Sequence, residues 1–128
     1  MSTKRLSNLI SLPWKVAEPH LQRALGGYDP SAEVAQGLAF PFYVGKPHQG
    51  AFVLVRTEQY EMVVVAFEGV HKLKDASAVL LKLAKAIKAT TIRLHTKRKG
   101  EQRYLNRLGL PFELVEMRGD EHVLRMVI

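Results

Sequence analysis

The sequence predicts a single α+β domain, and three observations carry this prediction. The chain has 128 residues, 47% of them hydrophobic, and a chain of this size and apolar content buries a core without disulfides. Runs of β-branched and aromatic residues alternate with segments in which apolar residues recur every three or four positions, as in amphipathic helices. One helical segment lies between two strand-like segments, which indicates a right-handed βαβ crossover.

The first third of the chain is predicted to be mainly helical. Residues 1–12 are polar with scattered leucines, so we expect a flexible lead-in before a single domain over residues 13–128. Pro13 suits the first turn of a helix, which Gly26-Gly27 would end. Asp29-Pro30 is typical of the N-cap and first residue of a short second helix.

Three strands are predicted in the middle of the chain. Residues 40–44 form a short strand that Pro41 restricts to an edge or an irregular position, because proline has no N–H to donate to a sheet ladder. Residues 51–56 and 60–67 are β-branched and aromatic runs separated by three polar residues. Two such runs joined by a short connection predict an antiparallel hairpin.

The crossover and a closing hairpin are predicted in the second half. Asp75 suits the N-cap of a helix whose apolar face would pack on the sheet. The strand after this helix should pair in parallel with residues 60–67. The predicted elements are a helix over 76–89, a strand over 91–95, a helix over 100–108 that ends at Gly109, and strands over 112–117 and 122–128.

Positive charge is concentrated in one segment. The chain has 19 Lys and Arg against 12 Asp and Glu, for a net charge of +7, and residues 82–107 contribute nine of the basic residues and one acidic residue. Clustered positive charge favours phosphate-bearing partners such as nucleic acids, and a solvated helix face is the alternative. The candidate nucleic-acid-binding residues are Lys97, Arg98, Lys99, Arg103 and Arg107.

The composition excludes several kinds of site. The chain has no cysteine, which excludes disulfides, thiolate metal sites and cysteine nucleophiles. Its five histidines lack metal-ligand spacing, so we expect no metal. The N-terminus lacks the apolar core of a signal peptide, and no apolar run is long enough to span a bilayer. We therefore expect a cytoplasmic protein with no membrane partner.

Arg93 and His95 alternate with Ile92 and Leu94, so they would share one face of a central strand. A buried arginine needs a charged or hydrogen-bonding partner. The pair is therefore a candidate to line a cleft and contact a ligand, and a structural role is the other interpretation.

The second half of the chain resembles the core of the GNAT-type N-acetyltransferases, in which a hairpin strand leads into a cofactor-binding loop and helix, a strand, a second helix and two closing strands. Residues 104–110, Tyr-Leu-Asn-Arg-Leu-Gly-Leu, are similar to the Tyr-x-x-x-Gly-Phe region at the end of the family's second helix. Residues 13–128 as a whole are similar to small GNAT-like proteins of bacteriophages and prophages. The resemblance implies a GNAT-like fold, a mixed and mostly antiparallel sheet flanked by helices, in a protein of a bacterial host.

The loop that would hold the cofactor departs from the family pattern. GNAT enzymes hold the pyrophosphate of acetyl-CoA on backbone N–H groups of an Arg/Gln-x-x-Gly-x-Gly/Ala loop at a helix N-terminus. The corresponding stretch here has a single glycine, so we expect acetyl-CoA to bind weakly or not at all. The cofactor-binding residues that the resemblance implies are Gly69, Val70, His71, Lys72 and Lys74.

The catalytic residues that the resemblance implies are also incomplete. Glu68, at the end of a central strand, would be the general base. The tyrosine that protonates the leaving thiolate in the family corresponds to Leu105, and Tyr104, the remaining candidate, lies about 100° away around the helix. The sequence therefore favours a phage or prophage accessory protein that acts by binding a phage or host partner, without normal acetyltransferase activity. The alternatives are an atypical coenzyme A-dependent N-acetyltransferase and a basic nucleic-acid-binding protein.

Overall fold

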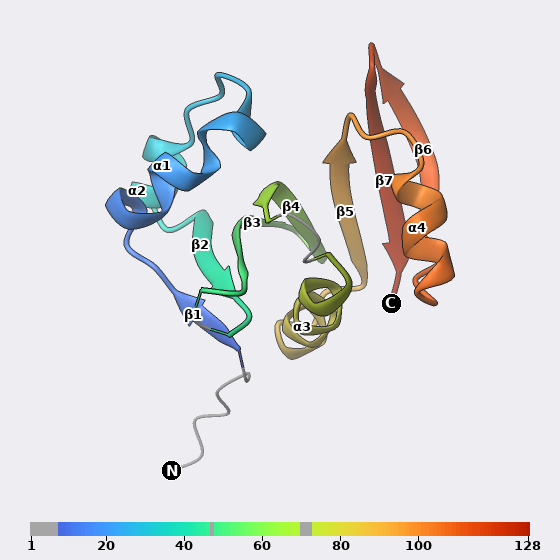
Figure 1. The fold of residues 1–128 in the computed structure, drawn as a ribbon, viewed down its shortest axis with the longest axis horizontal. Coiled ribbons are helices and arrows are strands. Elements are labelled where there is room, and N and C mark those ends of the chain that lie inside the picture. The colour runs from blue at the N-terminus through green and yellow to red at the C-terminus, as the bar shows by residue number, and fades with distance from the viewer. Residues whose placement is uncertain (1–7, 47, 70–72) are drawn as a thin grey trace.

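A mixed sheet of seven strands runs through the part of the chain that the computed structural model describes, residues 8–46, 48–69 and 73–128 (Figure 1). The strands are β1 (Leu9–Ser11), β2 (Ala39–Val44), β3 (Ala51–Glu58), β4 (Glu61–Glu68), β5 (Thr91–Thr96), β6 (Glu113–Arg118) and β7 (Glu121–Val127). The helices are α1 (Trp14–Leu25), α2 (Ser31–Ala35), α3 (Leu73–Ala86) and α4 (Glu101–Arg107).

The strands lie in the order β1-β2-β3-β4-β5-β7-β6. β4 and β5 are parallel, with α3 as the crossover between them, and the other neighbours are antiparallel. The structure therefore confirms the predicted α+β class, the hairpin of β3 and β4, and the parallel pairing of β4 with β5. The last strand, β7, lies between β5 and β6, an arrangement that the sequence did not predict.

Helices cover the two faces of the sheet. Leu21 and Leu25 of α1 are buried against Leu54 of β3. Leu80 of α3 belongs to a second core, which contains Val53, the neighbour of Leu54 in β3. Because successive residues of a strand point to opposite faces, α1 and α3 lie on opposite sides of the sheet. In the described ranges, no helix is long and apolar enough to cross a membrane.

Strand β1 lies within the segment 1–12 that we expected to be a flexible lead-in. Its backbone pairs with β2, from Leu9 opposite Val44 to Ser11 opposite Phe42. Leu9 packs against the larger core, so the scattered leucines of this segment include core contacts. Residues 1–7 lie outside the described part of the chain.

Pro41, predicted at an edge or an irregular position, lies in an interior strand where the ladder on one side ends. β2 has β1 on one side and β3 on the other, but the ladder with β1 ends at Phe42. The carbonyl of Pro41 accepts a hydrogen bond from the Leu12 N–H at 3.0 Å. Because the N–H and C=O of a strand residue point to the same side, the missing N–H of Pro41 faces the end of β1 and removes no bond to β3.

Candidate functional site

The parallel strands β4 and β5 separate toward their C-terminal ends. Their pairing ends with Val64 opposite Leu94, although β4 continues to Glu68 and β5 to Thr96. On its other side, β4 has a bulge, because Val55 pairs with Val64 while Leu54 pairs with Ala66. A bulge bends its strand. Beyond Val64 and Leu94, the backbones of β4 and β5 therefore diverge without a ladder between them.

A cavity of about 630 Å³ occupies the gap between the two strand ends. Residues of both strands and of α3 and α4 form its apolar wall. This wall includes Phe67, Leu80, Ile92 and Leu105. Gly26, at the end of α1, lines the cavity from the opposite face of the sheet. The cavity therefore passes between the strands and reaches both faces.

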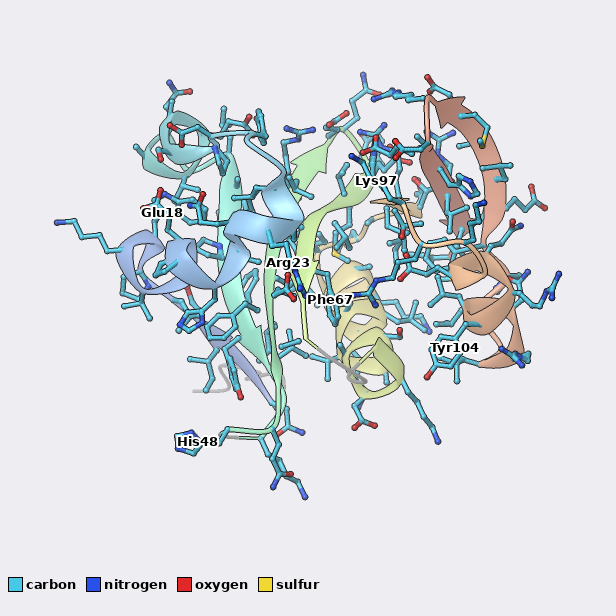
Figure 2. All side chains as sticks on the ribbon, turned by 45° about the horizontal axis from the view of Figure 1, so that its top comes forward. Glu18, Arg23, His48, Phe67, Lys97 and Tyr104 are labelled. Carbon is cyan, nitrogen blue, oxygen red and sulfur yellow. The ribbon has the colours of Figure 1, made fainter. Side chains whose placement is uncertain are left out.

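The rim of the cavity is charged. Figure 2 shows Arg23 of α1 beside Phe67 on one side of the opening and Lys97, which follows β5, on the other, and all three line the cavity. Glu68 and Glu121 add negative charge to the same rim. The site thus combines an apolar interior with ionisable groups at its mouth, which is the usual composition of a small-molecule site.

Glu68, the predicted general base, lines the cavity but is engaged by arginine. Nη2 of Arg23 donates to Oε2 of Glu68 at 2.7 Å, and the Glu68 side chain is 22% exposed. The hydrogen bond and the charge of Glu68 raise the pKa of Arg23. Arg23 therefore occupies one of the two carboxylate oxygens of Glu68 and places a positive charge beside it.

Tyr104 lies on α4 (Figure 2), is 38% exposed, and is not one of the residues that line the cavity. Leu105, the next residue, is 1% exposed and does line it. The structure therefore does not bring Tyr104 and Glu68 together at the cavity.

The residues expected to hold the cofactor are described only in part. Gly69 directly follows β4. Lys74 is exposed in the first turn of α3, which begins at Leu73, before the predicted cap Asp75. Val70, His71 and Lys72 lie outside the described residues.

The five candidate nucleic-acid-binding residues, Lys97, Arg98, Lys99, Arg103 and Arg107, are all exposed. They lie on the loop after β5 and on α4. Lys97 is 4.0 Å from Asp120, and the other four have no acidic partner among the described residues. Lys97 and Arg98 also line the cavity.

Arg93 and His95, which we expected to line a cleft together, have different surroundings. Arg93 is 17% exposed, forms ion pairs at 3.0 Å with Glu58 and Glu61, and does not line the cavity. His95 lines the cavity, and its Nδ1 lies 2.9 Å from Oε1 of Glu121. The prediction of a cleft-lining role therefore holds for His95, whereas Arg93 belongs to a network of ion pairs.

Glu61 is the centre of that network. Its side chain is 13% exposed, contacts Nη1 of Arg93 at 3.0 Å, and accepts hydrogen bonds from Nε of Arg125 at 2.7 Å and Oγ1 of Thr91 at 2.9 Å. Burial alone would raise the pKa of Glu61, but the hydrogen bonds from Arg125 and Thr91 and the charges of Arg93 and Arg125 outweigh it and hold the pKa below its ordinary value.

Glu121 is a cavity residue that the sequence reasoning did not identify. It begins β7 and reaches His95 because β7 pairs with β5, with His95 opposite Val123. The only signal in the sequence is the turn before the last strand. The turn does not indicate which strand lies beside residues 91–95, so the sequence alone could not place Glu121 at the cavity.

Comparisons with known proteins agree with this architecture. No protein-family model matches the chain, and no curated protein matches it. The ribosomal-protein-S18-alanine N-acetyltransferase from Escherichia coli matches with a TM-score of 0.64 at 12% identity, over 94% of this chain and 92% of that chain. An acetyltransferase from Bacillus subtilis, solved in complex with CoA, matches with a TM-score of 0.62 at 13% identity, over 94% of this chain and 98% of that chain. A probable acetyltransferase of the GNAT family from Chromobacterium violaceum matches with a TM-score of 0.61 at 15% identity, over 96% of this chain and 89% of that chain. At these identities the similarity establishes the fold, and it confirms the predicted GNAT-like fold.

Proposed function

We propose that this chain binds acetyl-CoA in the cavity between β4 and β5 and acts as an atypical N-acetyltransferase. The observation that carries the proposal is the separation of the two parallel strands around a cavity of about 630 Å³ that reaches both faces of the sheet. A similar fold solved in complex with CoA supports this function over the expectation that the chain binds no cofactor. The bound cofactor would supply an acetyl group activated as a thioester.

The chain offers several contacts for such a ligand. The backbones of β4 beyond Val64 and of β5 beyond Leu94 are not paired with each other, so amide groups of an extended ligand can hydrogen-bond to them as an added strand does. The apolar wall that contains Phe67 and Leu105 would keep water from the thioester. Lys74, exposed beside Asp75 in the first turn of α3, would supply a positive charge to the cofactor's phosphates.

Reversing the charge of Lys74 should weaken acetyl-CoA binding. We expect Lys74→Glu to raise the Kd about ten- to a hundredfold, because one charge-assisted phosphate contact contributes roughly 1.5–3 kcal/mol. Lys85→Glu is the matched control, because Lys85 is exposed in the last turn of the same helix. Isothermal titration of both variants measures the effect. Equal Kd values for the two variants would argue against phosphate binding at the start of α3.

The proposed activity is tested by release of free CoA thiol in the presence of amines. The acceptors to assay are spermidine, a peptide with a free α-amine and a peptide with a free lysine side chain. We expect amine-dependent thiol release together with an acetyl-CoA Kd of about 10–100 μM. Binding without thiol release would instead favour the partner-binding role, the one that we expected from the sequence for a phage or prophage accessory protein. Absence of binding at about 1 mM would contradict the proposed function.

A second candidate function, nucleic-acid binding, rests on the exposed basic residues of the loop after β5 and of α4. Arg98, Lys99, Arg103 and Arg107 have no acidic partner in the described ranges, so their charge is available to phosphates. Arg103 and Arg107 lie four positions apart on α4 and therefore on one side of it. Tyr104 is the one aromatic residue of α4, so base stacking would be minor and binding would be independent of sequence.

Removing charge from the loop should weaken binding to duplex DNA and reduce its dependence on salt. Replacing Lys97, Arg98 and Lys99 with alanine should flatten the log–log salt slope by about two to three units, since each neutralised phosphate contributes roughly 0.9. The comparison variant replaces Lys82, Lys85 and Lys88, which are also exposed but lie on or just after α3, and should change the slope less. Fluorescence anisotropy of a labelled duplex at several salt concentrations measures both. No binding by tens of micromolar protein at low salt would leave these residues as a solvated surface.

A further inference from the structure

His95 lies where the two parallel strands separate. It is the first residue of β5 beyond the ladder with β4, which ends at Leu94, and it lines the cavity. Ile92 is buried in the core that contains α3 and α4. Side chains alternate between the two faces along a strand, and His95 is three positions after Ile92. His95 therefore faces the other side of the sheet, where α1 lies. The imidazole is therefore placed at the mouth of the cavity opposite the helix that would hold the cofactor's phosphates.

Glu121 fixes the orientation of the His95 ring. Its Oε1 lies 2.9 Å from Nδ1, and the two side chains are 32% and 19% exposed, respectively. A carboxylate at this nitrogen favours the tautomer with the proton on Nδ1 and an electron pair on Nε2. Within the described part of the chain Nε2 has no hydrogen-bond partner, so it is available to a ligand in the cavity.

We propose that His95, oriented by Glu121, is the proton-transfer residue of this site and that the acceptor is a primary amine entering from the α1 side. This inference rests on the proposed transfer from acetyl-CoA. The amine nitrogen bonds to the acyl carbon, the C–S bond breaks, and the proton of the amine passes to Nε2. The imidazolium then gives that proton to the leaving thiolate, so that an amide and a thiol are the products.

This assignment does not need the two residues that the resemblance implied. Glu68 is paired with Arg23 at 2.7 Å, and the cavity-lining neighbour of Tyr104 on α4 is Leu105, which has no ionisable group. A histidine serves first as base and then as acid in the same reaction. One residue therefore replaces two, and neither Glu68 nor Tyr104 has to act.

The test compares three variants in the thiol-release assay and in acetyl-CoA titrations. His95→Gln should lower kcat/KM about 10²–10³-fold, the usual contribution of general acid–base catalysis, while the acetyl-CoA Kd and the melting temperature stay close to wild type. Glu121→Gln should lower kcat/KM about tenfold, since the ring loses its orientation. His122→Gln is the matched control, because His122 neighbours Glu121 on β7 but does not line the cavity, and it should leave kcat/KM unchanged.

Chemical rescue distinguishes proton transfer from a structural role. Added imidazole should restore part of the kcat/KM that His95→Ala loses, because free imidazole can enter the space of the missing ring and carry the proton. Wild-type kcat/KM in His95→Gln, or no rescue of His95→Ala by imidazole, would overturn the assignment. If the wild-type chain binds acetyl-CoA but Glu68→Gln alone abolishes transfer, Glu68 is the base. If the wild-type chain neither binds acetyl-CoA nor releases thiol, the proposed function fails and the assignment of His95 fails with it.

Discussion

Replacing Leu124 with alanine should lower the free energy of unfolding by about 2–5 kcal/mol, the range for a leucine deleted from a close-packed core. Leu124 is fully buried in the core between the sheet and the helices α3 and α4. It lies on β7, which has a strand on each side. The neighbouring strands restrain β7, so the backbone cannot easily move to fill the cavity that the substitution leaves.

Leu114→Ala is the matched control for this prediction. Leu114 pairs directly with Leu124 across β6 and β7 but is 44% exposed, so the same substitution should change the free energy of unfolding by less than about 1 kcal/mol. Urea denaturation of the two variants gives both values. Equal losses would mean that β6 is covered in solution or that β7 is not central to the core.

Glu61→Gln should also destabilise the protein, by about 2–3 kcal/mol at neutral pH. The substitution removes the negative charge that faces Arg93, which is 17% exposed, and replaces one carboxylate oxygen by an NH2 group, which cannot accept from either Arg93 or Arg125. A charged donor left without its acceptor in a partly buried site loses this order of free energy. In Glu116→Gln, where Glu116 and its partner Arg118 are both half exposed, stability should hardly change, because exposed ion pairs contribute little.

The destabilisation of Glu61→Gln should depend on pH. The folded-state pKa of Glu61 is lowered, so its contribution is fully present above the unfolded-state value of about 4.3 and is lost as the pH falls through the lower folded-state value. The difference in unfolding free energy between wild type and Glu61→Gln should therefore be largest near pH 7 and shrink below about pH 4. A difference that does not vary with pH would show that Glu61 is not stabilised as a carboxylate.

The sequence predicted most of the elements but not the surroundings of the site. Local patterns were sufficient for the hairpin of β3 and β4 and for the α3 crossover, because alternation and helical periodicity are properties of neighbouring residues. Pro41 shows where local reasoning stops. It indicated an edge strand or an irregular position, and only the early end of the β1 ladder explains how an interior strand accepts it.

The candidate site depends on contacts between distant segments, which local patterns do not contain. Arg23 reaches Glu68 across 45 positions of sequence, and Glu121 reaches His95 across 26. Both contacts follow from the packing of α1 and from the insertion of β7 beside β5. The family resemblance implied Glu68 as the base, and our proposal gives that role to His95 because of these contacts.

A crystal structure of the chain grown with acetyl-CoA tests the central claim most directly. We predict that the ligand's acyl end lies between the ends of β4 and β5, within hydrogen-bonding reach of their backbones beyond Val64 and Leu94 and beside His95, with its phosphates near the first turn of α3. The claim would be contradicted by a structure in which side chains close this cavity, or in which acetyl-CoA at saturating concentration is absent from it.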